Sequence, residues 1–361
     1  MELNVLVLPG DGIGVEVTRE AVRVLEHVGR RFGHQLRLTE GLLGAVAIHQ
    51  TGRPLPEETA RLARAADAIL LGAVGLPEFD SAPPERRPER GLLDLRKALG
   101  LYANLRPVVA YESLLGASPL KDAVVRGADM IIVRELTGGI YYGTPRGITT
   151  IDGEPTAVNT MLYRRSEVER VTRLAFALAR KRRKKLTSVD KANVLENSQM
   201  WRQVVTELGA EFPDVELDHI LVDNCAMQLV LNPRRFDVLV TENMFGDILS
   251  DEGAVLAGSI GMLPSASIGA QQPNGVWTGL YEPVHGAAPD IAGQNKANPL
   301  GAIGSVAAML SYSFGLAEEA RAVEQAIEKV LASGRVTADL KPAGPPATTE
   351  EVGRAVCEAI G

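Results

Sequence analysis

Two aspartates four residues apart, Asp247 and Asp251, form the pattern in this sequence that is best suited to chemistry. In a helix this spacing places both carboxylates on one face, one turn apart. Two like charges so placed repel each other and weaken the helix, so something must compensate them. A divalent cation is the simplest candidate, because Mg²⁺ prefers oxygen ligands and typically takes one or two protein carboxylates. The alternative is an ordinary solvated acidic helix face.

A third carboxylate, Asp223, follows the apolar run 219–222, and the aspartate pair follows another apolar run, 236–241. Both runs are typical of strands. Open α/β sheets bind their ligands beyond the carboxyl ends of the strands. The acidic residues therefore lie where a ligand site is expected.

Arginine, tyrosine and lysine side chains add candidates for substrate binding and proton transfer. Arg96, Arg106 and Arg134 lie near strand ends or glycines, and their fork-shaped guanidinium groups suit a dicarboxylic acid. Tyr141 and Lys191 have ordinary pKa values near about 10, too high for proton transfer at neutral pH. A nearby dication and arginines are expected to lower both pKa values. The alternative for each residue is a surface or structural role.

Two glycine-punctuated loops suggest a nucleotide site. The loop LPGDGIG (8–14) fails the G-x-G-x-x-G pattern because position 15 is Val15, so a Rossmann fold is not predicted. Its glycines still allow the backbone to approach a ligand closely. The second loop, 282–293, contains His285 and Asp290. An acid such as Asp290 can hold both ribose hydroxyls of NAD and repels the 2′-phosphate of NADP.

The elements that carry these residues alternate between strand and helix. An apolar strand at 3–8 precedes helical periodicity over 15–31, and further strands are predicted at 68–71, 130–133 and 238–240. This alternation predicts an α/β fold with a doubly wound, mostly parallel sheet. Glycines and alternating β-formers over about 138–163 predict a protruding antiparallel arm that pairs with a second subunit. The proline-rich stretches 81–90 and 342–348 predict surface loops.

Composition limits the class of protein. At 361 residues the chain exceeds the usual size of one core, and 45% hydrophobic with 23% charged residues fits a globular enzyme. A net charge of −7 argues against a protein that coats nucleic acid. The basic run 180–185 (RKRRKK) is an alternative nucleic-acid patch, but cations at a helix C-terminus are a simpler interpretation.

Location is also predicted from composition. The two cysteines lack metal-type spacing, which argues against a disulfide framework and favours a reducing, cytoplasmic environment. The N-terminal residues show no leader pattern, and no apolar run reaches about 18 residues, so neither a signal peptide nor a membrane span is expected.

The opening loop resembles that of the β-decarboxylating dehydrogenases, the isocitrate and isopropylmalate dehydrogenase family. Six further motifs, in order over nearly the whole chain, resemble the isopropylmalate branch of this family. They are LLDLRK (92–97), YANLRP (102–107), RELTGGIYYG (134–143), VDKANVLE (189–196), FGDILSDE (245–252) and YEPVHGAAPDIAG (281–293).

The resemblance implies a two-domain fold distinct from the Rossmann fold. Residues 1–101 and 258–361 are expected to form the cofactor-side domain with both termini. Residues 102–257 are expected to form the metal, substrate and dimerisation domain with the β-arm. The active site is expected in the cleft between them, completed by the second subunit of a homodimer.

The resemblance also implies a role for each matching residue. Arg96, Arg106 and Arg134 are expected to bind the malate carboxylates. Asp247 and Asp251 are expected to bind Mg²⁺ or Mn²⁺ with Asp223 of the partner subunit, which also contacts substrate. Tyr141, with Lys191 of the partner subunit, is the expected proton-transfer pair. The expected pocket for the substrate's γ-group is Glu89, Leu92, Leu93 and Val194. The expected NAD-binding residues are Ile13, Glu282, His285, Gly286, Ala287, Ala288, Asp290 and Asn298, with Asp339 in a context (TADLKPAG) that departs from the family pattern.

The implied reaction is the NAD-dependent oxidative decarboxylation of 3-isopropylmalate to 2-oxoisocaproate and CO₂ in leucine biosynthesis, with no nucleic-acid or membrane partner. A family member acting on isocitrate, homoisocitrate or tartrate is the nearest alternative. Leu92 and Leu93 argue against isocitrate, because they would leave its extra carboxylate buried and unpaired. An inactive regulatory subunit is a further alternative, but such subunits usually lose catalytic or metal residues that this chain retains.

Overall fold

The computed structural model describes residues 1–361 as two compact units. Unit 1 comprises Met1–Leu101, Tyr111–Pro119 and Ala257–Gly361, and unit 2 comprises Tyr102–Ala110 and Leu120–Leu256. Tyr111–Pro119 thus belongs to unit 1, whereas the sequence prediction placed it in the second domain. It packs there because Leu114 and Ala117 lie against Gly258 and because its 3₁₀ helix contacts α11 (Ala317–Ser333).

The sheet of unit 1 has the strand order β2-β1-β3-β12-β11. The pairs β1–β2, β1–β3 and β3–β12 are parallel, and β11 is antiparallel to β12. The strands span Glu2–Gly10 (β1), Gln35–Glu40 (β2), Ala68–Ala73 (β3), Pro264–Gln271 (β11) and Trp277–Pro283 (β12). All six residues of β3 are buried, as expected for a central strand that is covered on both faces.

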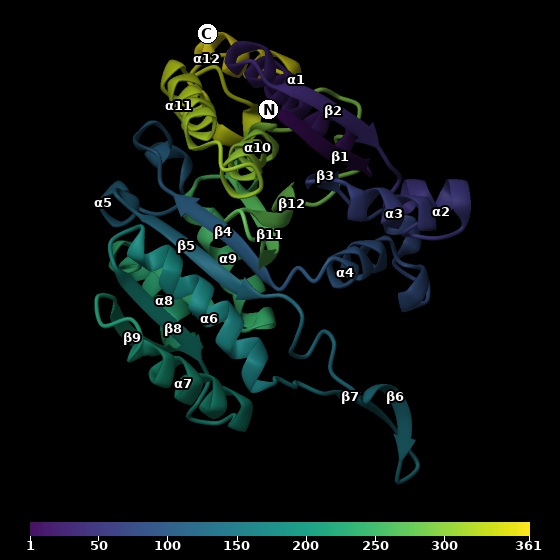
Figure 1. The fold of residues 1–361 in the computed structure, drawn as a ribbon, viewed down its shortest axis with the longest axis vertical. Coiled ribbons are helices and arrows are strands. Elements are labelled where there is room, and N and C mark those ends of the chain that lie inside the picture. The colour runs from purple at the N-terminus through teal and green to yellow at the C-terminus, as the bar shows by residue number, and fades with distance from the viewer. The chain divides into compact units, whose positions relative to one another are not determined.

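Helices cover this sheet. The helical spacing predicted near the N-terminus is realised in α1, which buries Val17, Ala21, Val24, Leu25 and Val28. α1 contacts α10 and α12, and these helices form a layer with α11 (Figure 1). Besides α11, the helices of unit 1 are α1 (Gly14–Phe32), α2 (Ala45–Thr51), α3 (Glu57–Ala65), α4 (Pro88–Ala98), α10 (Leu300–Tyr312) and α12 (Thr349–Ile360).

The proline-rich stretch 81–90 is not entirely a loop, contrary to the prediction. It contains a 3₁₀ turn at Pro84–Arg86, and α4 begins at Pro88. Proline is favoured at the first position of a helix because the amide it lacks has no helical partner there. The second stretch, 342–348, is a loop, as predicted.

The sheet of unit 2 has the strand order β4-β5-β10-β8-β9. β4 is antiparallel to β5, and the remaining pairs are parallel. The strands span Ala103–Val109 (β4), Asp129–Glu135 (β5), Lys185–Asp190 (β8), Glu216–Leu221 (β9) and Val238–Thr241 (β10). The predicted α/β class with doubly wound, mostly parallel sheets is confirmed.

The helices of unit 2 follow its strands in the expected alternation. They are α5 (Asp122–Val125), α6 (Arg165–Arg180), α7 (Glu196–Gly209), α8 (Val222–Leu231) and α9 (Asn243–Leu256). Strands β6 (Arg146–Ile151) and β7 (Glu154–Asn159) form a separate antiparallel hairpin that projects from the rest of unit 2 (Figure 1). This hairpin is the predicted arm, with its turn at Asp152 and Gly153. No helix in the chain has the length and apolar character needed to cross a bilayer.

Candidate active site

The aspartate pair lies on α9, which begins immediately after β10. As predicted, Asp247 and Asp251 lie one turn apart on one helix. Their charges are compensated within the chain by arginines. Nη1 of Arg134 is 2.5 Å from Oδ1 of Asp247, and Nη1 of Arg106 is 3.2 Å from Oδ1 of Asp251. Nη2 of Arg106 is also 3.4 Å from Asp247, so two cations neutralise two anions.

Strands β4 and β5 present both arginines. The guanidinium groups are nearly buried, since Arg106 is 8% and Arg134 is 5% exposed. Buried cations need hydrogen-bond acceptors, and each Nε donates to an asparagine Oδ1. Arg106 donates to Asn104 at 2.8 Å, and Arg134 donates to Asn243 at 3.0 Å. Gly246 on α9 leaves space for Arg134, because a Cβ there would overlap the arginine's Cβ and Cγ.

Tyr141 joins this cluster from the loop between β5 and β6. Its hydroxyl donates to Oδ2 of Asp247 at 3.1 Å, and the Arg134 guanidinium lies 5.8 Å from its ring centroid. Partial burial and the Asp247 carboxylate raise the pKa of Tyr141 above its ordinary value. The expected lowering of this pKa presupposes a bound dication; in the chain alone, burial and then the Asp247 carboxylate outweigh the opposing effect of Arg134.

Lys191 and Asp223 form a second cluster of unit 2. Lys191 follows β8 and Asp223 is the second residue of α8, and Nζ of Lys191 lies 2.6 Å from Oδ1 of Asp223. The lysine lowers the pKa of Asp223. No group of three or more His, Cys, Asp or Glu side chains in the chain could hold a metal ion. One chain therefore does not bring Asp223 together with Asp247 and Asp251.

In unit 1, Arg96 on α4 is buried and bonds to Glu282 on β12, with Nη2 2.5 Å from Oε1. Its Nε is buried without a hydrogen-bond partner, so an acceptor is missing there. Glu89 is exposed on the first turn of the same helix, and Leu92 packs at the edge of the core. Leu93 is half-buried. Val194, the other predicted pocket residue, is 60% exposed in unit 2.

The two predicted cofactor loops lie together in unit 1. The amide of Ile13 donates to the carbonyl of Ala287 at 2.8 Å. Gly12 has a φ of +56°, and a Cβ there would overlap the Ala287 carbonyl, so this close approach requires glycine. The buried carboxylate of Glu16 accepts from the amides of Gly293 and Asn295 at 2.8 and 2.7 Å.

His285 and Asn298 are two of the buried members of the predicted cofactor set. Nδ1 of His285 bonds to the Gly286 carbonyl at 2.9 Å, while Nε2 is buried without a partner. Burial lowers the pKa of His285, so the ring is neutral at pH 7. Nδ2 of Asn298 donates to Asp339 at 3.0 Å, which brings that aspartate into the same set. The remaining members differ in exposure: Asp290 and Gly286 are exposed, Ala288 is half-buried, and Ala287 and Glu282 are buried.

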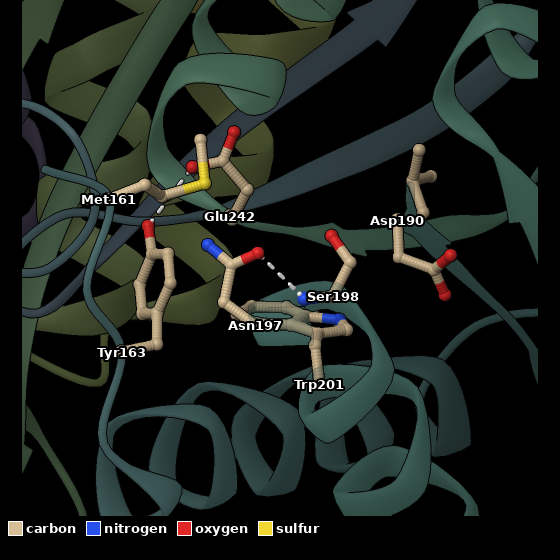
Figure 2. A pocket seen from close by; sticks show the side chains of 8 residues that line it. Met161, Tyr163, Asp190, Asn197, Ser198, Trp201 and Glu242 are labelled. Atoms are coloured by element: carbon tan, nitrogen blue, oxygen red, sulfur yellow. Dashed lines mark hydrogen bonds between the residues drawn. The ribbon is translucent and has the colours of Figure 1, made fainter. Parts of the chain in front are cut away.

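A small pocket in unit 2 contains none of the predicted residues. Its lining includes Tyr163 and Trp201, whose rings meet edge to face, together with Glu242 (Figure 2). The Tyr163 hydroxyl donates to Glu242 at 3.1 Å. Sequence reasoning missed Glu242 and its neighbour Asn243. The available signal was a polar pair directly after a predicted strand, where helices favour capping side chains.

Four of the six basic residues at 180–185 form ion pairs. Arg180 pairs with Asp214, and Arg182 bridges Asp129 and Asp237. Lys185 pairs with Glu216. These contacts leave little free charge for a nucleic acid and agree with the simpler interpretation of the run.

Comparisons with known proteins identify the family. Residues 4–356 match the family model described as isocitrate/isopropylmalate dehydrogenase. A 3-isopropylmalate dehydrogenase of Geobacillus kaustophilus is 61% identical over 94% of this chain and 91% of its own length. The corresponding enzyme of Shouchella clausii is 56% identical over 100% of this chain and 98% of its own.

A solved structure agrees with this assignment. The isocitrate dehydrogenase of Methylococcus capsulatus has a TM-score of 0.87 and is 36% identical, with 99% of each chain covered. The family model and the relatives span nearly the whole length of the chain. The chain therefore belongs to the isocitrate/isopropylmalate dehydrogenase family.

Proposed function

We propose that this chain catalyses the NAD-dependent oxidative decarboxylation of 3-isopropylmalate to 2-oxoisocaproate and CO₂, a step of leucine biosynthesis. The observation that carries the proposal is the cluster of Arg106, Arg134, Asp247, Asp251 and Tyr141 in unit 2. It combines carboxylate-binding cations, metal-binding anions and a proton donor. The 61% and 56% identical relatives bear the name of this activity.

The donor set fits a divalent cation, Mg²⁺ or Mn²⁺. Asp247 and Asp251 supply hard carboxylate oxygens, and Mg²⁺ sites typically use one or two carboxylates with substrate and water. Asp223 of the partner subunit is the third proposed ligand. Because the chain alone forms no cluster of three such side chains, supply of Asp223 by a second copy is consistent with the structure.

The buried polar atoms of unit 1 fit NAD and the substrate. With Nδ1 of His285 donating to Gly286, the unpartnered Nε2 is an acceptor, which an adenine amino group satisfies. We assign NAD binding to the predicted loop residues together with Asp339, which bonds to Asn298. The unpartnered Nε of Arg96 fits a carboxylate oxygen of the malate moiety.

Each of these residues then has its own role in the reaction. A bound NAD would supply a hydride acceptor, and a divalent cation held by Asp247 and Asp251 would supply Lewis-acid polarisation of the substrate's oxygens. Arg96, Arg106 and Arg134 hold the carboxylates. Lys191 of the partner subunit accepts the hydroxyl proton. After CO₂ leaves, Tyr141 donates its proton to the substrate carbon that carried it.

A homodimer is the proposed assembly. Helices α8 and α9 contact each other and expose a set of apolar side chains. The exposed fractions are 55% for Met227, 66% for Leu231 and 59% for Ile248. Apolar groups on adjacent helices favour burial against a second copy. The arm exposes Ile148 at 82%, which adds a strand surface for pairing. A cytoplasmic location stays a prediction, in agreement with two unpaired cysteines.

Enzyme assays test the function directly. NADH formation is measured with 3-isopropylmalate and Mg²⁺, then with a chelator, and with isocitrate or NADP as controls. Metal-dependent activity with 3-isopropylmalate and NAD supports the proposal. Activity on isocitrate instead would mean that Leu92 and Leu93 do not exclude the extra carboxylate of isocitrate. Inactivity on every 2-hydroxy acid would favour the alternative that this chain is an inactive regulatory subunit.

Replacing Leu93 with serine is expected to weaken turnover of 3-isopropylmalate. Removing an apolar contact from a hydrophobic pocket costs about 10- to 200-fold in kcat/KM. Leu93 is preferred over Leu92, which also packs against the core. The matched control is Leu36→Ser, a half-buried leucine on β2, which should leave kcat/KM unchanged. Equal kcat/KM values for Leu93→Ser and the original enzyme would show that Leu93 does not contact the substrate's γ-group.

Replacing Asp290 with asparagine is expected to weaken the preference for NAD over NADP. A hydrogen bond to a charged group contributes about 1.5–3 kcal/mol, so KM for NAD should rise about tenfold or more. Activity with NADP should rise, because the repulsion of its 2′-phosphate is removed. Asp80→Asn, an exposed aspartate of unit 1, is the control. An unchanged ratio of the two coenzymes would contradict the assignment.

A further inference from the structure

The two substrate arginines of unit 2 share one feature that their predicted role does not explain. Each buried guanidinium donates its Nε–H to the Oδ1 of a buried asparagine, Arg106 to Asn104 and Arg134 to Asn243. Asn104 is 0% and Asn243 is 1% exposed. Arginine has only donors, so the asparagine oxygen must face Nε and the amide orientation is settled.

Asn243 makes a second contact that links two parts of the site. Its Nδ2 donates to the carbonyl of Gly138 at 3.1 Å. Gly138 begins the loop that leads to Tyr141, and this loop is closed by the bond from Gly143 to the Gly139 carbonyl. A single amide therefore holds both the Arg134 side chain and the backbone that carries the proton donor.

The backbone of Asn243 is also held in place. Its main-chain N–H donates to the Tyr163 hydroxyl at 2.9 Å, and that hydroxyl donates to Glu242. Glu242 also accepts from the amides of Met244 and Phe245 at 3.1 and 2.6 Å, which fixes the first turn of α9. Figure 2 shows the Tyr163–Glu242 contact at this end of the helix. Both ends of Asn243 are thus anchored in buried structure.

We propose that Asn243 is a positioning residue that couples substrate binding by Arg134 to proton donation by Tyr141. Asn104 likewise holds the Nε of Arg106. With Nε occupied, the Nη groups of each arginine remain directed at carboxylates, as the contact of Arg134 with Asp247 shows. This proposal rests on the proposed function, which assigns substrate binding to Arg134 and proton donation to Tyr141.

The two asparagines provide a matched pair of variants. Asn104→Leu and Asn243→Leu each remove the acceptor of one arginine Nε, and leucine is close to asparagine in shape. Leaving a buried donor unsatisfied is costly, so KM for the substrate is expected to rise about tenfold in both. Only Asn243→Leu releases the Gly138 carbonyl, so only it should also lower kcat by about tenfold. Asn274→Leu, in an exposed turn, is the control.

A direct readout does not depend on activity. Buried, hydrogen-bonded arginine Nε–H groups exchange slowly and give ¹H–¹⁵N signals, and Arg134→Lys identifies the Arg134 signal. Asn243→Leu should abolish this signal, whereas Asn104→Leu should spare it. Asn243→Asp keeps the acceptor but not the donor, so it should retain the signal while kcat falls. This variant also serves if Asn243→Leu does not fold.

The combined results decide whether Asn243 couples Arg134 to Tyr141. Loss of the Arg134 signal together with a fall in kcat specific to Asn243 supports the coupling. An unchanged signal, or equal kcat values for the two leucine variants, overturns it. If the original enzyme prefers isocitrate, the proposed substrate fails, and the same KM and kcat comparison is made with isocitrate.

Discussion

Asp247→Asn should reduce kcat about 10²- to 10³-fold, because a bound cation contributes several kcal/mol of charge stabilisation and each 1.36 kcal/mol is a factor of ten. Asp247 contacts more of the site than any other carboxylate. It accepts from Arg134 and Tyr141 and lies 3.4 Å from Arg106. Asparagine keeps the shape but removes the charge that both the cation and the arginines require.

The measurement combines Mn²⁺ titration with steady-state kinetics. The Mn²⁺ affinity of Asp247→Asn should fall together with kcat. Asp122→Asn removes the same charge from an exposed position of unit 2 and should change neither quantity. If Asp247→Asn bound Mn²⁺ as tightly as the original enzyme and kcat stayed within about threefold of its value, the metal assignment would be wrong.

The parts of the fold that follow from local patterns were predictable from the sequence. The spacing of Val17, Ala21 and Val28 predicts one buried helix face, and α1 buries that face. The turn at Gly153 with flanking β-formers predicts the hairpin of β6 and β7. In both cases neighbours in the sequence are neighbours in the structure, so a pattern in the chain is sufficient.

The parts of the site that depend on distant segments were not predictable in the same way. The sequence indicates that the charges of Asp247 and Asp251 need compensation, but only the pairing of β4 with β5 shows that arginines supply it. Asn104 carries a weak local signal, since it lies two residues before Arg106 and on the same face of its strand. Asn243 carries none for its contact with Gly138, which lies 105 residues away.

The raised pKa of Tyr141 in the chain alone depends on a contact that the sequence does not show. The sequence predicts a nearby dication and arginines, which lower a tyrosine pKa, but it does not predict that the hydroxyl donates to a carboxylate. The structure shows an arginine and a carboxylate beside the hydroxyl, and burial together with Asp247 raises the pKa of Tyr141 more than Arg134 lowers it. Tyr141 is thus a protonated hydroxyl at neutral pH in the chain alone, which is the form that a proton donor must have.

Tyr141→Phe should therefore separate the two halves of the reaction. The ring and its contact with the Arg134 guanidinium are retained, and only the proton-donating oxygen is removed. Removing a general acid typically costs about 10²- to 10⁴-fold in the step that it assists. Hydride transfer does not use this proton, so NADH should still form rapidly in the first turnover, while 2-oxoisocaproate should form slowly.

A rapid-quench experiment measures both products in a single turnover. The original enzyme should form NADH and 2-oxoisocaproate on similar time courses, whereas the variant should form NADH first. Tyr312→Phe, the same change in unit 1 beside Trp277, should keep the original timing. Normal release of 2-oxoisocaproate by Tyr141→Phe would mean that another group donates the proton. Because Asn243 holds the loop of Tyr141, its leucine variant should show the same delay in weaker form, since the hydroxyl is displaced rather than absent.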